Sequence, residues 1–254
     1  MTAARARPSI RRTHRGWRIS QHGTVLSEVL RQPGPTHSVF DVLAAACLTA
    51  APVRDIALLG FGGGSVVAAL RALGCTARIH AVDLDPTGWT LLQQADASWL
   101  QPFTWHQGDA ITWLQSAGCF DVVVDDLSIP RDGDVVKPDA TWSILPNQVV
   151  QHLRPHGVAL FNLLRPTRQG WVRGIPSIAA RFRQGVIIHL HDFENRILVA
   201  RKAAGGIHSQ AFAPRRFGAD LRSRLRRLGS HQRARTQTRA LPVGDRNAMP
   251  ALTS

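Results

Sequence analysis

The sequence predicts an α/β protein built on an open, doubly wound, mostly parallel sheet. From Val53 onward, short aliphatic runs alternate with amphipathic stretches, which is typical of βαβ units. A glycine run, Gly60 to Gly64, directly follows the first aliphatic run. The last two apolar runs, 185–190 and 196–200, are separated by a short polar turn, as in an antiparallel hairpin. We therefore expect seven strands, the last two of which form that hairpin.

The expected strands are short and mostly apolar, and they fall at residues 56–59, 78–83, 103–106, 120–125, 158–162, 185–190 and 196–200. The helix after the glycine run is the clearest one, with Ser65 as a candidate N-cap and an apolar stripe along one side. Ahead of these elements, residues 17–20 and 24–27 can pair as a small hairpin, and a helical pattern runs from residue 40 to residue 50.

The charge distribution suggests how the chain of 254 residues is divided. The formal net charge is +14, yet residues 21–206 hold 15 basic and 15 acidic side chains, so the excess lies at the two ends. We expect four parts: a basic tail over residues 1–14, a hairpin and helix segment over 15–50, a nucleoside-binding domain over 51–204, and an arginine-rich tail over 205–254. The interpretation that assigns both tails no binding role is that they are solvated polypeptide.

Several classes of protein are disfavoured by composition. No apolar run approaches the ~18 residues that a membrane span needs, and no apolar stretch follows Arg11 and Arg12 as it would in a secretory signal. The three cysteines are scattered, without the spacing of a zinc site or of a disulfide framework, and the histidines show no metal spacing either. We expect a cytoplasmic protein without a metal and without a membrane partner.

The glycine run and Asp83 together point to nucleoside binding. Residues Gly60, Gly62, Gly63 and Gly64 lie between a strand and a helix, where backbone N–H groups can approach a nucleotide. Asp83 ends the next strand, where a carboxylate can accept both hydroxyls of a ribose. The alternatives are a purely structural tight turn for the glycines and an ordinary turn acid for Asp83.

A third acid, in the run Gly108-Asp109-Ala110, follows the third strand of the series. There Asp109 can accept a hydrogen bond from an adenine amino group, although its alternative role is that of a helix N-cap, and the two roles are compatible. NAD is the rival ligand. The dinucleotide pattern G-x-G-x-x-G would place glycine at position 65, where this chain has serine, so that pattern is incomplete.

The succession LLGFGGGS, AVDLDP, GDA and FDVVVDD, followed by LRPHGVALFNLL, resembles the spermidine synthase-like branch of the class I S-adenosylmethionine-dependent methyltransferases. The resemblance covers residues 53–202. It implies a Rossmann-like fold, a glycine loop against the nucleoside, Asp83 on the ribose, and Asp109 with Ala110 at the adenine. It also places Asp125 where the acceptor amine meets the sulfonium carbon, which makes Asp125 the predicted catalytic residue.

The sequence also departs from this family. Aminopropyltransferases carry a second acid in a D-x-x-D run, whereas here the run is Asp125-Asp126-Leu127-Ser128. They also use tyrosines around the polyamine, and this chain has none. Strand alternation lets at most one of Asp125 and Asp126 face the pocket, and we expect it to be Asp125. The bland alternative for this pair is two solvated loop acids.

The predicted function is therefore transfer of an aminopropyl or methyl group from S-adenosylmethionine, or from its decarboxylated form, to an amine or another small acceptor. The alternative is a non-catalytic nucleoside-binding or nucleic-acid-associated protein that uses its arginine-rich ends on phosphates. The sequence does not fix the oligomeric state, and a homodimer is one of the states that it allows.

Overall fold

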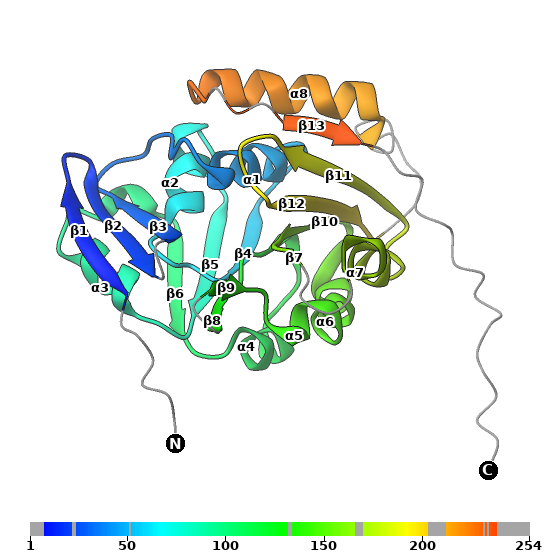
Figure 1. Ribbon diagram of the computed structural model, residues 1–254, viewed down its shortest axis with the longest axis horizontal. Helices are drawn as coiled ribbons and strands as arrows, with labels where there is room; N and C mark the ends of the chain where they lie inside the picture. Colours follow the sequence, from blue (N-terminus) through cyan, green and yellow to red (C-terminus); the bar gives the residue numbers. More distant parts are fainter. Residues whose placement is uncertain are drawn as a thin grey trace, which may run out of the picture.

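An eight-stranded sheet lies at the centre of the structure (Figure 1). The computed structural model describes residues 8–21, 24–50, 52–131, 134–165, 170–202, 212–230, 232 and 234–237. The strand order is β13-β11-β12-β10-β7-β4-β5-β6. The five strands β10, β7, β4, β5 and β6 are parallel, and they span Leu153–Leu163, Phe120–Asp125, Asp55–Leu59, Arg78–Asp83 and Phe103–Gln107. The α/β fold and its large, mostly parallel sheet are thus as predicted.

The other end of the sheet is antiparallel. Strand β12 (Arg196–Arg201) pairs antiparallel with both β10 and β11 (Gln184–Leu190). A further strand, β13 (Ala234–Gln237), pairs antiparallel with β11, so that the sheet has eight strands instead of the expected seven. The extra strand comes from the segment expected to be a tail. Its sequence ARTQ has no apolar pattern, and it is placed by backbone pairing with the edge of β11.

Helices cover both faces of the sheet, as a parallel sheet requires. One apolar cluster lies between the sheet and helices α1 (Val39–Cys47), α2 (Ser65–Ala72) and α8 (Pro214–Arg227), with α3 (Thr87–Gln93) and the 3-10 turn Ser98–Leu100 at its side. A second cluster lies on the opposite face, beneath α4 (Ala110–Ser116), α6 (Leu145–His152) and α7 (Gly170–Ala179). The short helix α5 (Asp139–Trp142) follows a small hairpin, β8 (Ile129–Arg131) and β9 (Asp134–Val136).

A separate three-stranded sheet precedes the large one. Strands β1 (Ser9–Thr13), β2 (Gly16–Gln21) and β3 (Thr24–Leu30) are antiparallel in that order. The pairing expected between residues 17–20 and 24–27 is present, but β1 lies inside the segment expected to be a basic tail. Its sequence SIRRT does not predict a strand, because polar side chains occur on both of its faces. Backbone pairing with β2 holds this segment in its extended conformation.

Helix α8 forms an outer layer over α1 (Figure 1). All nine residues of α1 are buried, since the sheet covers one side of the helix and α8 contacts another. Phe217, Leu221 and Leu225 of α8 and its C-cap Leu228 belong to the main apolar cluster. The expectation of a solvated tail over residues 205–254 therefore fails for α8 and β13, which are parts of the domain.

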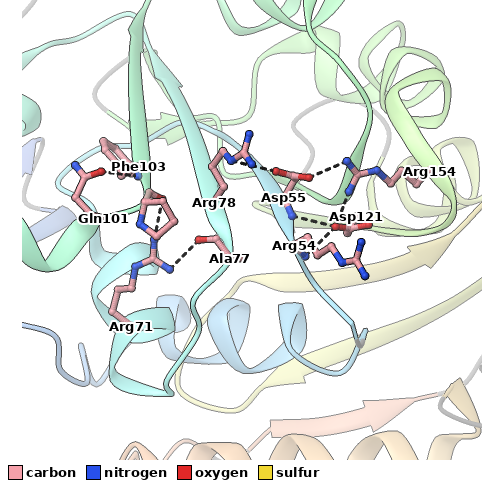
Figure 2. A network of polar contacts seen from close by, with 10 residues as sticks. Arg54, Asp55, Arg71, Ala77, Arg78, Gln101, Phe103, Asp121 and Arg154 are labelled. Carbon is pink, nitrogen blue, oxygen red and sulfur yellow. Dashed lines mark hydrogen bonds and ion pairs between the residues drawn. The ribbon is translucent and has the colours of Figure 1, made fainter.

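The amino ends of the parallel strands are tied together by an ion-pair network (Figure 2). Arg154 Nη1 contacts Asp121 Oδ2 and Arg154 Nη2 contacts Asp55 Oδ2, each at 2.7 Å. Asp121 Oδ2 also accepts hydrogen bonds from the backbone N–H groups of Arg54 at 2.8 Å and Asp55 at 2.9 Å. The network thus joins β4, β7 and β10 at the edge where these strands begin.

Among the described residues, no helix is long and apolar enough to cross a membrane.

Candidate functional site

A cleft of about 1600 Å³ lies over the carboxyl ends of the parallel strands. It is lined by Gly60, Phe61 and Gly62 of the glycine loop after β4, by Asp83 at the end of β5 and by Asp109 after β6, whereas Gly63 and Gly64, also expected at the nucleoside, are not part of the lining. The hairpin β8/β9, the end of β10 and the turn between β11 and β12 also contribute to the lining. In open α/β sheets, ligands collect at this edge. The three positions singled out for nucleoside binding are thus brought together in one cleft.

The glycine loop needs its glycines for conformation and for space. Gly60, Gly62 and Gly64 have φ angles of 89°, 54° and 78°, values that favour glycine. A Cβ on Gly60 would lie 2.6 Å from the backbone oxygen of Asp126, so the loop can pass this close to the end of β7 only without a side chain. Gly64 is the N-cap of α2 and Ser65 is its first residue, which corrects the expected N-cap at Ser65.

Strand β3 is fastened to the glycine loop by two serines. The backbone N–H of Gly63 donates to Ser27 Oγ at 2.8 Å. The hydroxyl of Ser65 donates to the carbonyl of Glu28 at 2.9 Å and accepts from the N–H of Glu28 at 3.0 Å. Ser27 and Glu28 both line the cleft, so the small N-terminal sheet supplies one of its walls.

Asp83 holds the glycine loop from the other side. Its Oδ2 accepts hydrogen bonds from the N–H groups of Phe61 and Gly62, both at 2.8 Å, and its Oδ1 accepts from the N–H of Asp85 at 3.0 Å. A carboxylate has about four lone-pair sites, so capacity remains for a hydroxyl donor in the cleft. Asp83 therefore shapes the loop and still presents a charged acceptor to a ligand.

Asp109 has the capping role that was weighed against ligand binding. It is the N-cap of α4, and its Oδ1 accepts from the N–H of Thr112 at 2.8 Å and from the hydroxyl of Thr112 at 2.9 Å. Asp109 and Ala110 both line the cleft. Because the cap occupies only Oδ1, the position is compatible with the second role as well.

Asp125 does not line the cleft, which overturns the expectation that it faces the reacting centre. Its side chain is fully buried, and Oδ1 accepts from Lys137 Nζ at 2.8 Å and from the N–H of Leu127 at 3.0 Å. Lys137 follows β9, and its side chain is 1% exposed. Strand alternation explains the result, because it places the Asp125 side chain on the same face of β7 as Val123, two residues earlier. Val123 belongs to the apolar cluster on the face of the sheet opposite α1.

Asp126 is the acid of the pair that lines the cleft. Its Oδ1 accepts from Asn162 Nδ2 at 2.7 Å, and Asn162 Oδ1 accepts from Asn195 Nδ2 at 2.9 Å. Burial raises the pKa of Asp126 to about 7. The nearby carboxylates of Asp125 and Asp83 also raise this pKa, whereas the hydrogen bond from Asn162 and the charge of Lys137 lower it. Near neutral pH, this carboxyl can therefore both accept and release a proton.

The cleft is acidic although the whole chain is basic. Three Lys or Arg side chains line it, Arg18, Lys137 and Arg165, against seven carboxylates, Glu28, Asp83, Asp85, Asp109, Asp126, Asp134 and Glu194. An excess of carboxylates favours cationic ligands, since like charges in a cleft reinforce one another's field.

Sequence reasoning missed part of the lining. Asn162 and Asn195 carry no motif by themselves, and their contact depends on the antiparallel pairing of β10 with β12.

His37, which also lines the cleft, is a non-glycine residue with a φ of 53°, and its N–H donates to the buried Asp41 Oδ2 at 2.9 Å. Such a conformation costs energy and persists only where its surroundings hold it, as Asp41 does here.

No protein-family model matches the sequence, and no curated protein matches it significantly. Solved structures do match. Human methyltransferase-like protein 13, in complex with SAH, aligns with a TM-score of 0.60 at 20% identity, over 76% of this chain and 92% of that one. A probable spermidine synthase from Corynebacterium glutamicum aligns with a TM-score of 0.66 at 16% identity, over 91% and 86%. Spermidine synthase from Thermotoga maritima gives 0.57 at 11% identity, over 82% and 76%.

These likenesses show the fold. The chain has the Rossmann-like fold that methyltransferases and spermidine synthases share. Within that class, its likeness to the C. glutamicum protein extends over more of the chain than its likeness to the human methyltransferase-like protein.

Proposed function

We propose that this protein is a transferase that binds S-adenosylmethionine, or its decarboxylated form, in the cleft. The observation that carries the proposal is the convergence of Gly60 and Gly62, Asp83 and Asp109 at the ends of three adjacent parallel strands. Each group fits one part of an adenosine: backbone against the nucleoside, a carboxylate for the ribose hydroxyls and an acid for the adenine amino group. The fold shared with methyltransferases and spermidine synthases supports this assignment.

The reaction proposed is displacement at a carbon bound to the donor's sulfonium sulfur. The acceptor nitrogen forms a bond to that carbon, the carbon–sulfur bond breaks, and its electron pair leaves with a neutral thioether. An amine that enters as an ammonium ion must first give one proton to a base, which frees the lone pair for this attack, and the nitrogen of the product then carries the positive charge. We assign that base to Asp126, because this residue lines the cleft and its pKa of about 7 suits proton transfer near neutral pH.

Aminopropyl and methyl transfer both fit this arrangement, and the proposed acceptor is an amine or another small nucleophile. The acidic lining suits an amine, which approaches as a cation before it loses its proton. Position 128 carries a serine that lines the cleft, so the second carboxylate expected for a diamine is missing there. We accordingly expect putrescine to be a poor acceptor. Losing one charge-assisted hydrogen bond costs about 1.5–3 kcal/mol, or roughly one to two decades in efficiency.

Donor binding is tested by thermal melting of the full chain. At about 100 times its dissociation constant a ligand adds about 2.7 kcal/mol, and each kcal/mol shifts the melting temperature by roughly 2–4 °C at this size. S-adenosylmethionine, its decarboxylated form or methylthioadenosine should raise the melting temperature, and NAD should not. Asp83→Asn should remove most of this rise in melting temperature, because the charged acceptor is lost, while the amide oxygen can still accept from the N–H groups of Phe61 and Gly62. Asp139→Asn, an exposed acid outside the cleft lining, is the control. Stabilisation by NAD alone would refute the proposal.

The transferred group is then identified by incubating the protein with each donor and a panel of amines. Mass spectrometry distinguishes a methylated product from an aminopropylated one. Absence of any product with either donor, in a protein that binds them, would leave donor binding intact and contradict the proposed transfer.

A further inference from the structure

The outer face of α8 is a basic surface separate from the cleft. Around this helix, the buried residues Phe217, Leu221, Leu225 and Leu228 form one stripe, which belongs to the same apolar cluster as α1. The opposite side carries five exposed arginines, Arg215, Arg216, Arg222, Arg226 and Arg227. The apolar stripe explains why the helix is docked, and the arginines are left facing solvent.

The positive charge of this face is not neutralised within the described part of the chain. The acid of the helix, Asp220, is paired with Arg224 at 3.1 Å. Among the described residues, the five exposed arginines of α8 form no ion pair with a carboxylate. The neighbouring strand β13 adds a further exposed arginine, Arg235. Because residues 21–206 are neutral in sum, much of the net positive charge is concentrated here.

The arginines are arranged in rows. Residues seven and eleven positions apart lie on nearly the same side of an α-helix, so Arg215, Arg222 and Arg226 form one row, with Arg216 and Arg227 in a second row beside it. At about 1.5 Å per residue, the first row is roughly 16 Å long. Duplex nucleic acid carries one phosphate per about 1.7 Å of axis, so a row of this length faces several phosphates. Guanidinium groups bind phosphate oxygens in a bidentate manner.

We propose that this face of α8 docks the protein onto nucleic acid through the phosphate backbone. A membrane-binding helix needs a free apolar face, and the apolar face of α8 is buried against the domain. No large apolar side chain of α8 is exposed; those exposed elsewhere in the described ranges are Ile10, Val25, Leu84, Ile144 and Val172. The observations therefore favour a phosphodiester backbone, bound without reading of sequence, over a lipid surface.

This docking surface is independent of the proposed transfer. No residue of α8 lines the cleft, so loss of the arginines should leave donor binding unchanged. Failure of one proposal therefore does not imply failure of the other.

The test uses the full chain and fluorescently labelled oligonucleotides, one a duplex DNA and one a single-stranded RNA. Anisotropy should report binding at about 50 mM salt that weakens steeply towards about 200 mM, with a slope of about −0.9 per phosphate neutralised on the duplex. The triple variant Arg215→Gln, Arg222→Gln, Arg226→Gln should lose at least about tenfold in affinity and show a shallower salt slope. Its melting temperature and its donor-induced shift should match those of the wild type.

The matched control removes the same charge elsewhere. Arg173, Arg181 and Arg183 are exposed and lie in α7 or directly after it, against the opposite apolar cluster. Replacing these three with Gln should leave affinity within about threefold of wild type. Equal losses in both triple variants would show an unlocalised charge effect and overturn the proposal. So would wild-type affinity in the α8 variant, no binding by the wild type at about 50 mM salt, or binding to phosphatidylserine vesicles without binding to either oligonucleotide.

Discussion

At the level of single residues, the titration of the Asp126 carboxyl can be followed through the pH dependence of the transfer rate. Burial raises its pKa to about 7, and a base acts in its deprotonated form. We expect kcat/KM for transfer to rise with pH through about 7 and then level off, because this parameter reports groups of the free enzyme. Asp126→Asn should abolish transfer, or leave a residual rate that does not rise with pH through about 7. An unchanged pH profile in the variant would contradict the assignment.

The same carboxyl should also influence stability. Its folded pKa of about 7 lies above the unfolded value of about 3.9, so the folded protein loses stability as the pH rises through that interval. Asp126→Asn is always neutral and should escape this loss. Melting temperatures of the two proteins should therefore diverge in favour of the variant between about pH 4 and about pH 7. A constant difference across this interval would show that Asp126 keeps its ordinary pKa.

Asp125 and Lys137 form a buried ion pair whose two halves depend on each other. Their side chains are 0% and 1% exposed and lie 2.8 Å apart. Removing one partner leaves an unpaired buried charge, so Lys137→Met should destabilise the protein by about 3–5 kcal/mol. The double variant with Asp125→Leu should recover most of that loss, since an apolar pair of similar size is often neutral. Urea unfolding measures both, and a double variant as unstable as the single one would contradict this view.

At the level of elements, the strands with an apolar pattern were predictable and the others were not. Strands β4 to β7 and β10 to β12 overlap the short, mostly apolar runs that predicted them. Strands β1 and β13 have polar sequences and owe their order to a neighbouring strand edge, so no local pattern indicates them. The sequence spaces Leu221, Leu225 and Leu228 at i, i+4 and i+7, but the partner of this apolar stripe, the outer side of α1, becomes evident only in the folded chain.

The site was predictable to a similar extent and for similar reasons. Glycines and acids at strand ends identify the cleft, because parallel strands end at one edge of the sheet. The expectation that Asp125 and not Asp126 faces the cleft was wrong, because the outcome depends on where the β8/β9 hairpin places Lys137, and no local pattern indicates that.

The glycine loop gives a test of close approach. A Cβ on Gly60 would meet the backbone of Asp126 at 2.6 Å, at a φ of 89°. Gly60→Ala should therefore shift the loop or the end of β7 and weaken donor binding, with a stability cost on the order of 1–3 kcal/mol. Gly118→Ala is the control, because a Cβ there meets nothing within 4 Å. Donor-induced melting shifts measure the effect, and equal shifts in both variants would refute it.

The network at the opposite edge of the sheet predicts a pH-dependent loss of stability (Figure 2). Burial acts to raise the pKa of Asp121, but hydrogen bonds from Arg154 and from two backbone N–H groups outweigh it and hold the pKa below its usual value. A depressed carboxyl pKa stabilises the folded state above about pH 3.9, and the contribution is lost as the pH falls through the folded value.

Arg154→Met should accordingly cost about 1.5–3 kcal/mol at neutral pH, near the lower end because Arg154 is 39% exposed. The difference from wild type should shrink as Asp121 is protonated. Arg78→Met is a matched control, since Arg78 is 62% exposed and its Nε lies 3.6 Å from Asp55 Oδ1. That control should stay within about 0.5 kcal/mol of wild type. Chemical unfolding at several pH values checks both, and an Arg154 effect that persists at low pH would contradict the mechanism.

At the scale of the whole molecule, charge is sorted by location. Carboxylates outnumber basic side chains in the cleft, residues 21–206 as a whole are balanced in charge, and arginines are exposed on α8. A basic protein can thus present an acidic cleft to a cationic ligand and a basic face to phosphates, each without neutralising the other.

The outer layer itself should be essential to folding, contrary to what its composition indicates. Leu221 is 1% exposed and belongs to the main apolar cluster, so Leu221→Ala should cost about 2–5 kcal/mol, while Arg222→Ala on the exposed side should stay within about 0.5 kcal/mol. A chain ending at residue 206 lacks α8 and β13, which uncovers α1 and the edge of β11. We expect that chain to aggregate or to melt without cooperativity, whereas a chain ending at residue 237 keeps every described element and should melt as the full chain does. Calorimetry distinguishes these outcomes, and an unchanged cooperative melt of the shorter chain would show that α8 is dispensable.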